Sequence, residues 1–178
     1  MKKIPTKLKD LNIFKGLNFK DKRGYLRELT IEKLIGKKLV FNILSKSHKG
    51  VLRGLHFQSK NSQGKYVSVL KGKILDVAVD LRKNSKTFLK HFKIILSEKN
   101  CTSVYIPPGF AHGFLGMEKE NLVMYGCTKY RNKKSETGIK WNDKNLKINW
   151  NIKKPILSKK DAKNKSLNEI IKKTKKKK

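Results

Sequence analysis

The chain has 178 residues and a mass of 20.6 kDa, a size typical of one compact domain with one hydrophobic core. Hydrophobic residues make up 37% of it, which excludes a chain that is disordered throughout. Lys and Arg number 45 against 13 Asp and Glu, so the formal charge is +32, a value typical of nucleic-acid binders and anionic-membrane proteins. The apolar runs fall far below the roughly 20 residues of a membrane span, so we expect a soluble protein.

The positive charge consists almost entirely of lysine, since only five of the 45 basic residues are arginines. Nucleic-acid interfaces rely on the planar fork of arginine, whereas lysine is a hydrated point charge that tolerates scattering over a surface. We therefore interpret the charge as surface composition and expect no nucleic-acid partner, with a cationic nucleic-acid-binding β-domain as the remaining alternative. Residues 166–178 are expected to form a lysine-rich, disordered tail, for which polyanion binding is the alternative.

The N-terminal residues and the cysteines both indicate the compartment of the protein. Lys2 and Lys3 are not followed by the apolar stretch of a secretory signal, so we expect a cytoplasmic protein without a membrane partner. Cys101 and Cys127 are isolated from each other and from any zinc-binding spacing, which indicates buried free thiols.

In chain order, weak helical patterning at Thr30–Leu34 precedes a long series of short apolar segments, and weak helical patterning returns around Leu167–Ile171. The segments are separated by Gly, Pro, Asn and Ser at a spacing close to the roughly 8–12 residues of antiparallel sandwiches and barrels. We predict one all-β domain over residues 1–165, a sandwich or barrel with small helical additions. The predicted strands are Val51–Phe57, Tyr66–Leu70, Lys73–Val79, His91–Leu96, Ser103–Ile106, Phe110–Leu115 and Asn121–Cys127.

Alternation within two of these strands places ionisable groups on a strand face. In the strand at 73–79 the residues Leu75, Val77 and Val79 share one face, and Asp76 lies on the other face with Asp80. The strand at 51–57 is expected to put Arg53 on the face opposite His56. Such polar faces are either solvated or line a ligand cavity inside a small barrel.

Two of the four histidines are candidates for chemistry. His48 and His91 lie in basic surroundings and are expected to be exposed, whereas His56 and His112 are embedded among small and apolar residues. A histidine in such a place is either a satisfied core residue or part of a cavity. Other ionisable groups that could share that cavity are Arg53, Lys65, Asp76 and Tyr125.

A metal site has little support, because the chain contains no His-x-His pair. His56, Asp76 and His112 alone would make only a weak set of ligands, and no metal is expected.

Several motifs together carry a resemblance to a known family. They are Gly50-Val51-Leu52-Arg53-Gly54-Leu55-His56-Phe57-Gln58, Gln63-Gly64-Lys65, Asp76-Val77-Ala78-Val79-Asp80-Leu81-Arg82, Ile106-Pro107-Pro108-Gly109-Phe110-Ala111-His112-Gly113-Phe114, Tyr125, Ser135-Glu136-x-Gly138-Ile139-x-Trp141-Asn142-Asp143 and Leu157-Ser158-Lys159-Lys160-Asp161. The chain from about Asn18 to Asp161 resembles the dTDP-4-dehydrorhamnose 3,5-epimerases. The resemblance implies a cupin-type jelly roll, a homodimer, no metal or other cofactor, and a dTDP-linked 4-keto-6-deoxyhexose as substrate.

The resemblance also implies roles for individual residues. His56 matches the base that removes a proton, Asp161 its carboxylate partner, Lys65 the cation beside the carbonyl oxygen, and Tyr125 the acid on the opposite face of the sugar. An alternative for Asp161 is a surface acid, and for Tyr130 a packing role at a strand end. The residues matched to substrate binding are Arg23, Glu28, Arg53, Asp76, His112 and Tyr130.

One segment departs from the family pattern. Phe41 and Ile43 stand where the family usually has the amides of a Gln-x-Asn segment, which leaves the exact nucleotide and sugar open. A mono-epimerase or a ketoisomerase acting on a related nucleotide-linked 4-keto sugar is therefore the alternative function. The presence of both His56 and Tyr125 favours epimerisation, because one removes and the other returns a proton.

Overall fold

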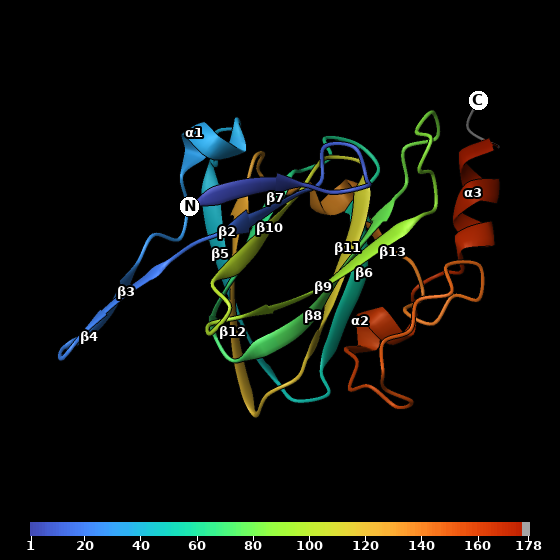
Figure 1. Ribbon diagram of the computed structural model, residues 1–178. Coiled ribbons are helices and arrows are strands. Elements are labelled where there is room, and N and C mark those ends of the chain that lie inside the picture. Colours follow the sequence, from blue (N-terminus) through green and yellow to red (C-terminus); the bar gives the residue numbers. More distant parts are fainter. Residues whose placement is uncertain (176–178) are drawn as a thin grey trace.

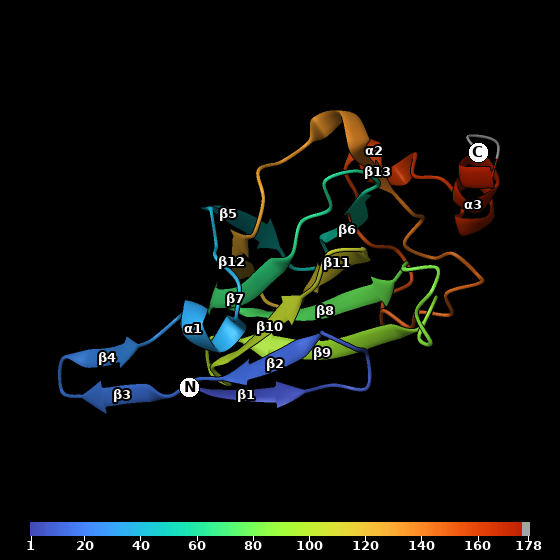
Figure 2. The same cartoon turned by 90° about the horizontal axis from the view of Figure 1, so that it is seen from above.

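The computed structural model describes residues 1–175, and Figure 1 shows two β-sheets that face each other with three short helices at the margins. One sheet has six strands in the order β1-β2-β10-β7-β12-β5, and the other has five in the order β13-β6-β11-β8-β9. A separate two-stranded hairpin, β3-β4, projects away from the sandwich (Figures 1 and 2). This arrangement is the antiparallel sandwich that the strand pattern predicted.

The strands have the following bounds: β1 (Lys2–Pro5), β2 (Asn12–Lys15), β3 (Asn18–Asp21), β4 (Gly24–Arg27), β5 (Phe41–His48), β6 (Leu52–Gln58), β7 (Lys65–Lys71), β8 (Lys73–Asp80), β9 (His91–Ser97), β10 (Thr102–Ile106), β11 (Phe110–Gly116), β12 (Glu120–Cys127) and β13 (Glu136–Gly138). The helices are α1 (Glu32–Ile35), α2 (Lys159–Ala162) and α3 (Leu167–Lys175), with a 3₁₀ turn at Lys133–Ser135. All seven predicted strands are present within a few residues of their expected ends. Strands β1 to β5 and β13 were not predicted.

The glycine at position 72 allows the tight connection between β7 and β8. Its φ of +82° lies in the left-handed region, and a Cβ there would come within 2.3 Å of the Glu120 carbonyl oxygen. The chain can therefore pass directly from one sheet into the other, since β7 belongs to the six-stranded sheet and β8 to the five-stranded sheet.

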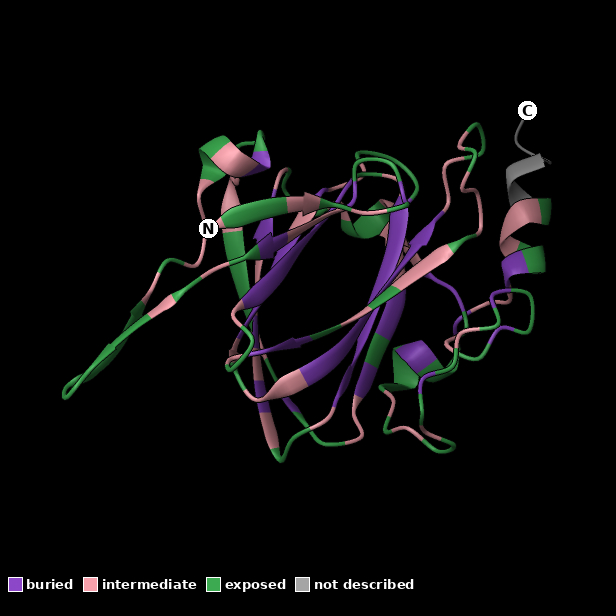
Figure 3. Ribbon diagram, viewed as in Figure 1, coloured by how far each residue is buried: buried purple, intermediate pink, exposed green. Residues whose placement is uncertain are grey.

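Two large apolar clusters cover the two faces of the five-stranded sheet. The first lies between the two sheets and includes Val67, Ile74 and Phe114. The second lies outside the five-stranded sheet, where the C-terminal segment covers it around Trp150. Figure 3 shows the resulting purple, buried strands of both sheets, with exposed residues gathered on the hairpin and the connections.

Strand β8 is buried on both of its faces. Leu75, Val77 and Val79 pack into the outer cluster, as the alternation predicted, but Asp76 and Asp80 are 1% and 0% exposed. The solvated interpretation of that acidic face is therefore wrong. Each acid is buried with a hydrogen-bonding partner. Asp76 pairs with His112 at 2.7 Å, and Asp80 pairs with Arg82 at 2.9 Å.

Strand β6 departs from regular alternation. Arg53 and His56 both line the same cavity, although residues three apart on a regular strand point to opposite faces. The reason is an irregularity in the pairing with β11: His56 pairs with His112 and Arg53 with Phe114, and the register shifts between them. Our expectation that Arg53 and His56 lie on opposite faces is wrong for this reason.

The C-terminal segment differs from the disordered tail that we expected over residues 166–178. Helix α3 spans Leu167–Lys175, and Leu167 is only 2% exposed because it packs, with Ile170 and Ile171, against the outer cluster. The apolar spacing around Leu167–Ile171 therefore outweighs the lysine content of this segment. Residues 176–178 lie outside the described part of the chain. None of the helices within residues 1–175 is long and apolar enough to cross a membrane.

Candidate active site

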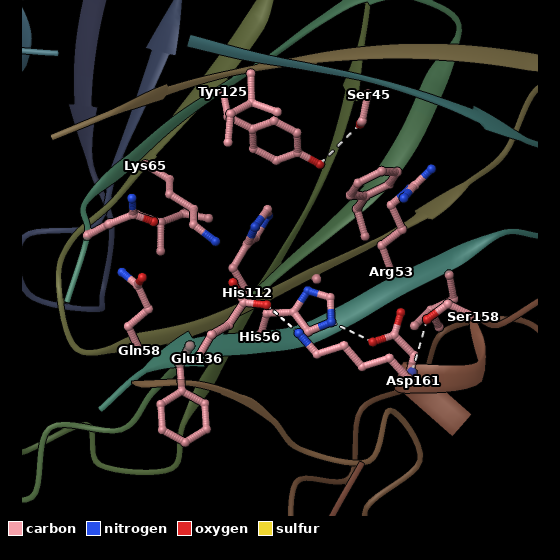
Figure 4. Close-up of a pocket in the computed structure, with 18 of the residues that line it drawn as sticks. Ser45, Arg53, His56, Gln58, Lys65, His112, Tyr125, Glu136, Ser158 and Asp161 are labelled. Carbon is pink, nitrogen blue, oxygen red and sulfur yellow. Dashed lines mark hydrogen bonds and ion pairs between the residues drawn. The ribbon is translucent and has the colours of Figure 1, made fainter. Parts of the chain in front are cut away.

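A cavity of about 510 Å³ opens between the two sheets. Strands β5, β7 and β12 of the six-stranded sheet form one wall, and strands β6, β11 and β13 of the five-stranded sheet form the other. Helix α2 and the segment before it close one side. Figure 4 shows that polar side chains from both walls point into this space.

His56 and Asp161 form a hydrogen-bonded pair at the edge of the cavity. The Nε2 atom of His56 lies 2.5 Å from Oδ1 of Asp161, and the Asp161 side chain is 5% exposed. Ser158 caps the N-terminus of α2 by accepting a hydrogen bond from the Asp161 amide at 3.0 Å. Burial of the Asp161 carboxyl raises its pKa, but the hydrogen bond and charge of His56 outweigh burial, so the pKa lies below its usual value. The carboxylate form is therefore the one that faces His56.

Tyr125 lies on the wall opposite His56, on β12. Its hydroxyl contacts the Ser45 hydroxyl at 3.4 Å, and its ring meets the ring of His112 edge-on at 6.0 Å between centroids. Burial raises the pKa of the Tyr125 phenol well above its usual value. The phenol is therefore protonated at neutral pH and can donate a proton into the cavity.

Lys65 enters the cavity from β7. No side chain within residues 1–172 accepts a hydrogen bond from its ammonium group or forms an ion pair with it. Burial lowers the pKa of Lys65, and the nearby charges of Glu136 and Asp76 oppose this effect. A partly desolvated and unpaired cation is suited to an oxyanion, because electrostatic attraction is stronger where water is excluded.

A second His–Asp pair lies at the floor of the cavity. His112 Nε2 lies 2.7 Å from Asp76 Oδ2, and both side chains are almost fully buried. His112 lines the cavity on β11, while Asp76 lies behind it on the neighbouring strand β8. Asp76 thus fixes the orientation of a histidine that faces the cavity.

Cationic groups surround the cavity. The Arg53 guanidinium donates to the Ser47 hydroxyl and the Lys46 carbonyl, each at 2.9 Å. At the other end Glu136 accepts hydrogen bonds from both Arg131, at 2.6 and 2.9 Å, and Lys160. The Arg131 hydrogen bond, followed by that of Lys160, lowers the pKa of Glu136 to about 2 despite partial burial. Such a lining suits an anionic ligand.

Sequence comparison assigns the chain to a family. The family model described as dTDP-4-dehydrorhamnose 3,5-epimerase matches residues 5–169. The chain belongs to the dTDP-4-dehydrorhamnose 3,5-epimerase family. It is 42% identical to the dTDP-4-dehydrorhamnose 3,5-epimerase of Shigella flexneri over 90% of this chain and 93% of the relative.

Solved structures of dTDP-4-dehydrorhamnose 3,5-epimerase family members share the fold. The chain is similar to the dTDP-4-dehydrorhamnose 3,5-epimerase of Elizabethkingia anophelis NUHP1, with 43% identity, a TM-score of 0.87 and coverage of 95% and 97% of the two chains. It is also similar to the epimerase of Legionella pneumophila Philadelphia 1 in complex with dTDP-4-keto-L-rhamnose, with 41% identity, a TM-score of 0.89 and coverage of 94% and 93%. The jelly-roll fold and the epimerase activity that the resemblance implied are thereby confirmed.

Within this epimerase fold, most of the site residues that we expected gather at one place. Six line the cavity: Arg53, His56, Lys65, His112, Tyr125 and Asp161. Asp76 supports His112 from behind. Asp161 is therefore a buried member of the cavity and not the surface acid of the alternative interpretation.

Three of the expected residues lie elsewhere in the chain. Arg23 and Glu28 are on or beside the projecting β3-β4 hairpin, and Arg23 pairs there with Asp21 at 2.6 Å. Tyr130 is 73% exposed and stacks on Phe41 with 5.6 Å between ring centroids, outside the cavity lining. The packing role of Tyr130 at a strand end is thus the one that the contacts favour.

Several residues of the cavity lining were not expected from the sequence. Glu136 and Lys160 occur inside the quoted motifs and could have been found there, whereas Ser45, Arg131 and Cys127 carry no recognisable signal. Cys127 is a buried free thiol, and Cys101 is a free thiol of intermediate exposure. Among residues 1–175 no group of His, Cys, Asp and Glu side chains has the arrangement of a metal site.

Proposed function

We propose that the chain epimerises a dTDP-linked 4-keto-6-deoxyhexose at carbons 3 and 5 without a cofactor. The observation that carries this proposal is the placement of His56, paired with Asp161, on one wall of the cavity and of Tyr125 and Lys65 on the opposite wall. The family membership and the dTDP-4-keto-L-rhamnose bound to the similar Legionella pneumophila epimerase support the substrate class.

Each epimerisation needs one proton removed and one returned. The carbon 4 ketone acidifies the hydrogens on carbons 3 and 5, so His56 can remove one of them as its imidazole becomes protonated. Asp161 stabilises the imidazolium that forms and fixes the orientation of the ring. The electron pair left by the proton moves onto the carbonyl oxygen, where the Lys65 ammonium stabilises the enolate charge.

The configuration inverts because the proton returns from the other side. Tyr125 donates its phenol proton to the opposite face of the same carbon, and the ketone forms again. The raised pKa of the buried Tyr125 keeps the proton in place until the enolate forms. His56 then releases its proton to solvent, and Tyr125 takes up a proton from solvent. Both residues return to their starting protonation states, and the product has the same atoms as the substrate.

The rest of the site suits the nucleotide diphosphate. Arg53, and Arg131 with Lys160 beside Glu136, add cations to the lining of the cavity. A guanidinium binds two phosphate oxygens at once, which supports a diphosphate contact for Arg53. The expected roles of Asp76 and His112 in orienting the sugar belong to the same proposal.

We further propose a homodimer in which the β3-β4 hairpin of each protomer completes the cavity of the other. Its exposed apolar residues support this, since Phe19, Tyr25 and Leu26 are 57%, 55% and 66% exposed on a two-stranded ribbon. Arg27 anchors the base of the hairpin to the sandwich by donating to the Val69 carbonyl at 2.9 Å. A second copy would bring Arg23 and Glu28 to a substrate that they cannot reach within their own chain.

The proposal includes a cytoplasmic location, which the two free thiols support, because oxidising compartments favour disulfides. The +32 charge would then serve to attract an anionic substrate rather than a nucleic acid.

Incubation of the substrate with the protein in deuterated water, followed by NMR, tests the reaction. Deuterium at both carbon 3 and carbon 5 with inversion at each is the expected result. Deuterium at one carbon alone would identify a mono-epimerase, and a keto group that moves would identify a ketoisomerase. An absence of both exchange and isomerisation would refute the proposal.

Mixing two inactive variants tests the dimer. The His56→Ala chain has an inactive cavity and an intact hairpin. The Arg23→Ala chain has an intact cavity and a hairpin that lacks its arginine. The two variants are unfolded, mixed in equal amounts and refolded together. About half of the dimers should then be mixed, and each mixed dimer should contain one intact cavity of two. About a quarter of the wild-type activity should therefore return. No recovery in mixed dimers of confirmed composition would contradict the exchanged hairpin.

A further inference from the structure

Asn164 is a buried polar residue just beyond α2, the helix that carries Asp161. It is 8% exposed, and its backbone N–H donates to the Asp161 carbonyl at 3.2 Å. The next residue, Lys165, accepts a hydrogen bond from the Lys140 amide at 2.8 Å. The backbone on both sides of Asn164 is thus fixed, and its side chain points into the protein between α2 and the five-stranded sheet.

The side-chain amide of Asn164 contacts Asp161 and the strand that carries His56. Its Nδ2 group donates to Asp161 Oδ1 at 3.4 Å, the same oxygen that His56 Nε2 contacts at 2.5 Å. The same group lies 3.5 Å from the carbonyl oxygen of Gly54, two residues before His56 on β6. One amide therefore connects the carboxylate to the strand that carries the histidine.

Gly138 on β13 fixes the position of this amide by contact. It pairs with His56 across the β13–β6 ladder, and a Cβ at this position would lie 2.4 to 2.6 Å from the Asn164 side-chain atoms Oδ1, Nδ2 and Cγ. Atoms at such a distance cannot coexist, so only glycine leaves room for the amide where it lies. The amide is held by steric contact as well as by its hydrogen bonds.

We propose that Asn164 is a positioning residue that holds the Asp161 carboxylate against His56. The inference rests on the proposed function, because it assigns Asn164 a role in the same proton removal. Asn164 does not touch the cavity itself; it acts through Asp161. Its amide restricts the carboxylate to one rotamer and takes up part of the charge on the oxygen that faces His56.

Asn164→Leu keeps the approximate volume and removes the donor. We expect kcat to fall by about 10- to 100-fold with little change in KM, by analogy with outer hydrogen-bonding partners of metal-ligating side chains, whose removal costs losses of that size. The freed carboxylate attracts the imidazole proton more strongly, so the acidic limb of the kcat/KM profile should shift to higher pH. The ¹⁵N shifts of the His56 ring should change in the same variant.

Gly138→Ala tests the position of the same amide, because it adds a methyl group beside the Asn164 side chain. Its methyl group must displace the Asn164 side chain, so it should reproduce the loss in kcat. In the double variant Gly138→Ala/Asn164→Ala, the shortened side chain at position 164 leaves space for the methyl group. The kcat of the double variant should therefore be no lower than that of Asn164→Ala alone. If the two substitutions acted independently, their fold-losses in kcat would multiply.

Leu167→Ala is the control for a general loss of stability, because it removes a buried side chain from the outer cluster without touching Asp161. It should lower Tm and leave kcat and the pH profile unchanged at a temperature where the protein stays folded. The positioning role is refuted if folded Asn164→Leu keeps the wild-type kcat and pH profile, or if the effects at 138 and 164 multiply. If the wild-type protein itself shows no proton exchange, the proposed function fails instead.

Discussion

The imidazole of His56 lies 2.5 Å from the carboxylate of Asp161, although the two residues are 105 positions apart in the sequence. The contact joins β6 of the sandwich to the short helix α2, which the C-terminal segment places beside the sheet. Because the carboxyl is buried and its pKa is lowered, the pair brings a fixed negative charge to a histidine at the cavity edge. This is the arrangement that makes a histidine an effective base.

Asp161→Asn should preserve the shape of the pair and remove its charge. The amide cannot stabilise an imidazolium and allows the wrong tautomer of His56, so we expect kcat to fall by about 10³- to 10⁴-fold, as for a similar change in a Ser-His-Asp triad. Steady-state kinetics with the wild-type protein as reference measure this loss. A decrease below tenfold in a folded variant would exclude an essential role for the charge.

Asp80→Asn should change the response of stability to acid. Burial raises the pKa of Asp80, but hydrogen bonds from Arg82, Ser85 and Thr87 lower it to about 2 from an ordinary value of 3.8. A lowered pKa means that the stabilisation is present above about pH 3.8 and is lost as the pH falls towards 2. Tm measured across this window should fall less steeply in Asp80→Asn than in the wild-type protein. Parallel curves would contradict the pKa shift.

Tyr105→Phe should stabilise the fold. The Tyr105 hydroxyl is buried and has no hydrogen-bonding partner among the side chains of residues 1–172 or the backbone of residues 1–175, while burial raises its pKa to about 12. Removal of an unpaired buried hydroxyl should increase the free energy of unfolding by about 0.5–1 kcal/mol, measured by urea denaturation. Because Tyr105 lies outside the cavity lining, kcat should not change. A loss of stability would show that the hydroxyl is satisfied in solution.

The sequence was most informative where strands are regular. Strands β6 to β12 were predicted because each has an apolar pattern bounded by turn residues, and β8 has the β-branched composition of a central strand. Strand β5 was missed because Phe41–His48 mixes polar and apolar residues without a clear period. Helix α2 has only four residues, which is too short for a helical period to appear.

The candidate site was predictable only in part, for similar reasons. His56, Lys65, Tyr125 and Asp161 were found through motifs, but the shared face of Arg53 and His56 depends on a register shift that no pattern reveals. Asn164 is an ordinary polar residue in a lysine-rich segment. Its contact with Asp161 depends on the path of the chain after α2, and only the three-dimensional structure reveals it.

Tyr125→Phe in deuterated water tests most directly the claim that His56 and Tyr125 act on opposite faces of the sugar. His56 can still remove a proton and return a deuteron on its own side, so the account predicts deuterium entering the substrate with its configuration retained, while epimerisation falls by about 10²-fold or more. Tyr105→Phe, which alters a tyrosine outside the cavity lining, is the matched control and should epimerise normally. Epimerisation by Tyr125→Phe at the wild-type rate, or equal loss of exchange and inversion, would contradict the assignment of Tyr125 as the acid.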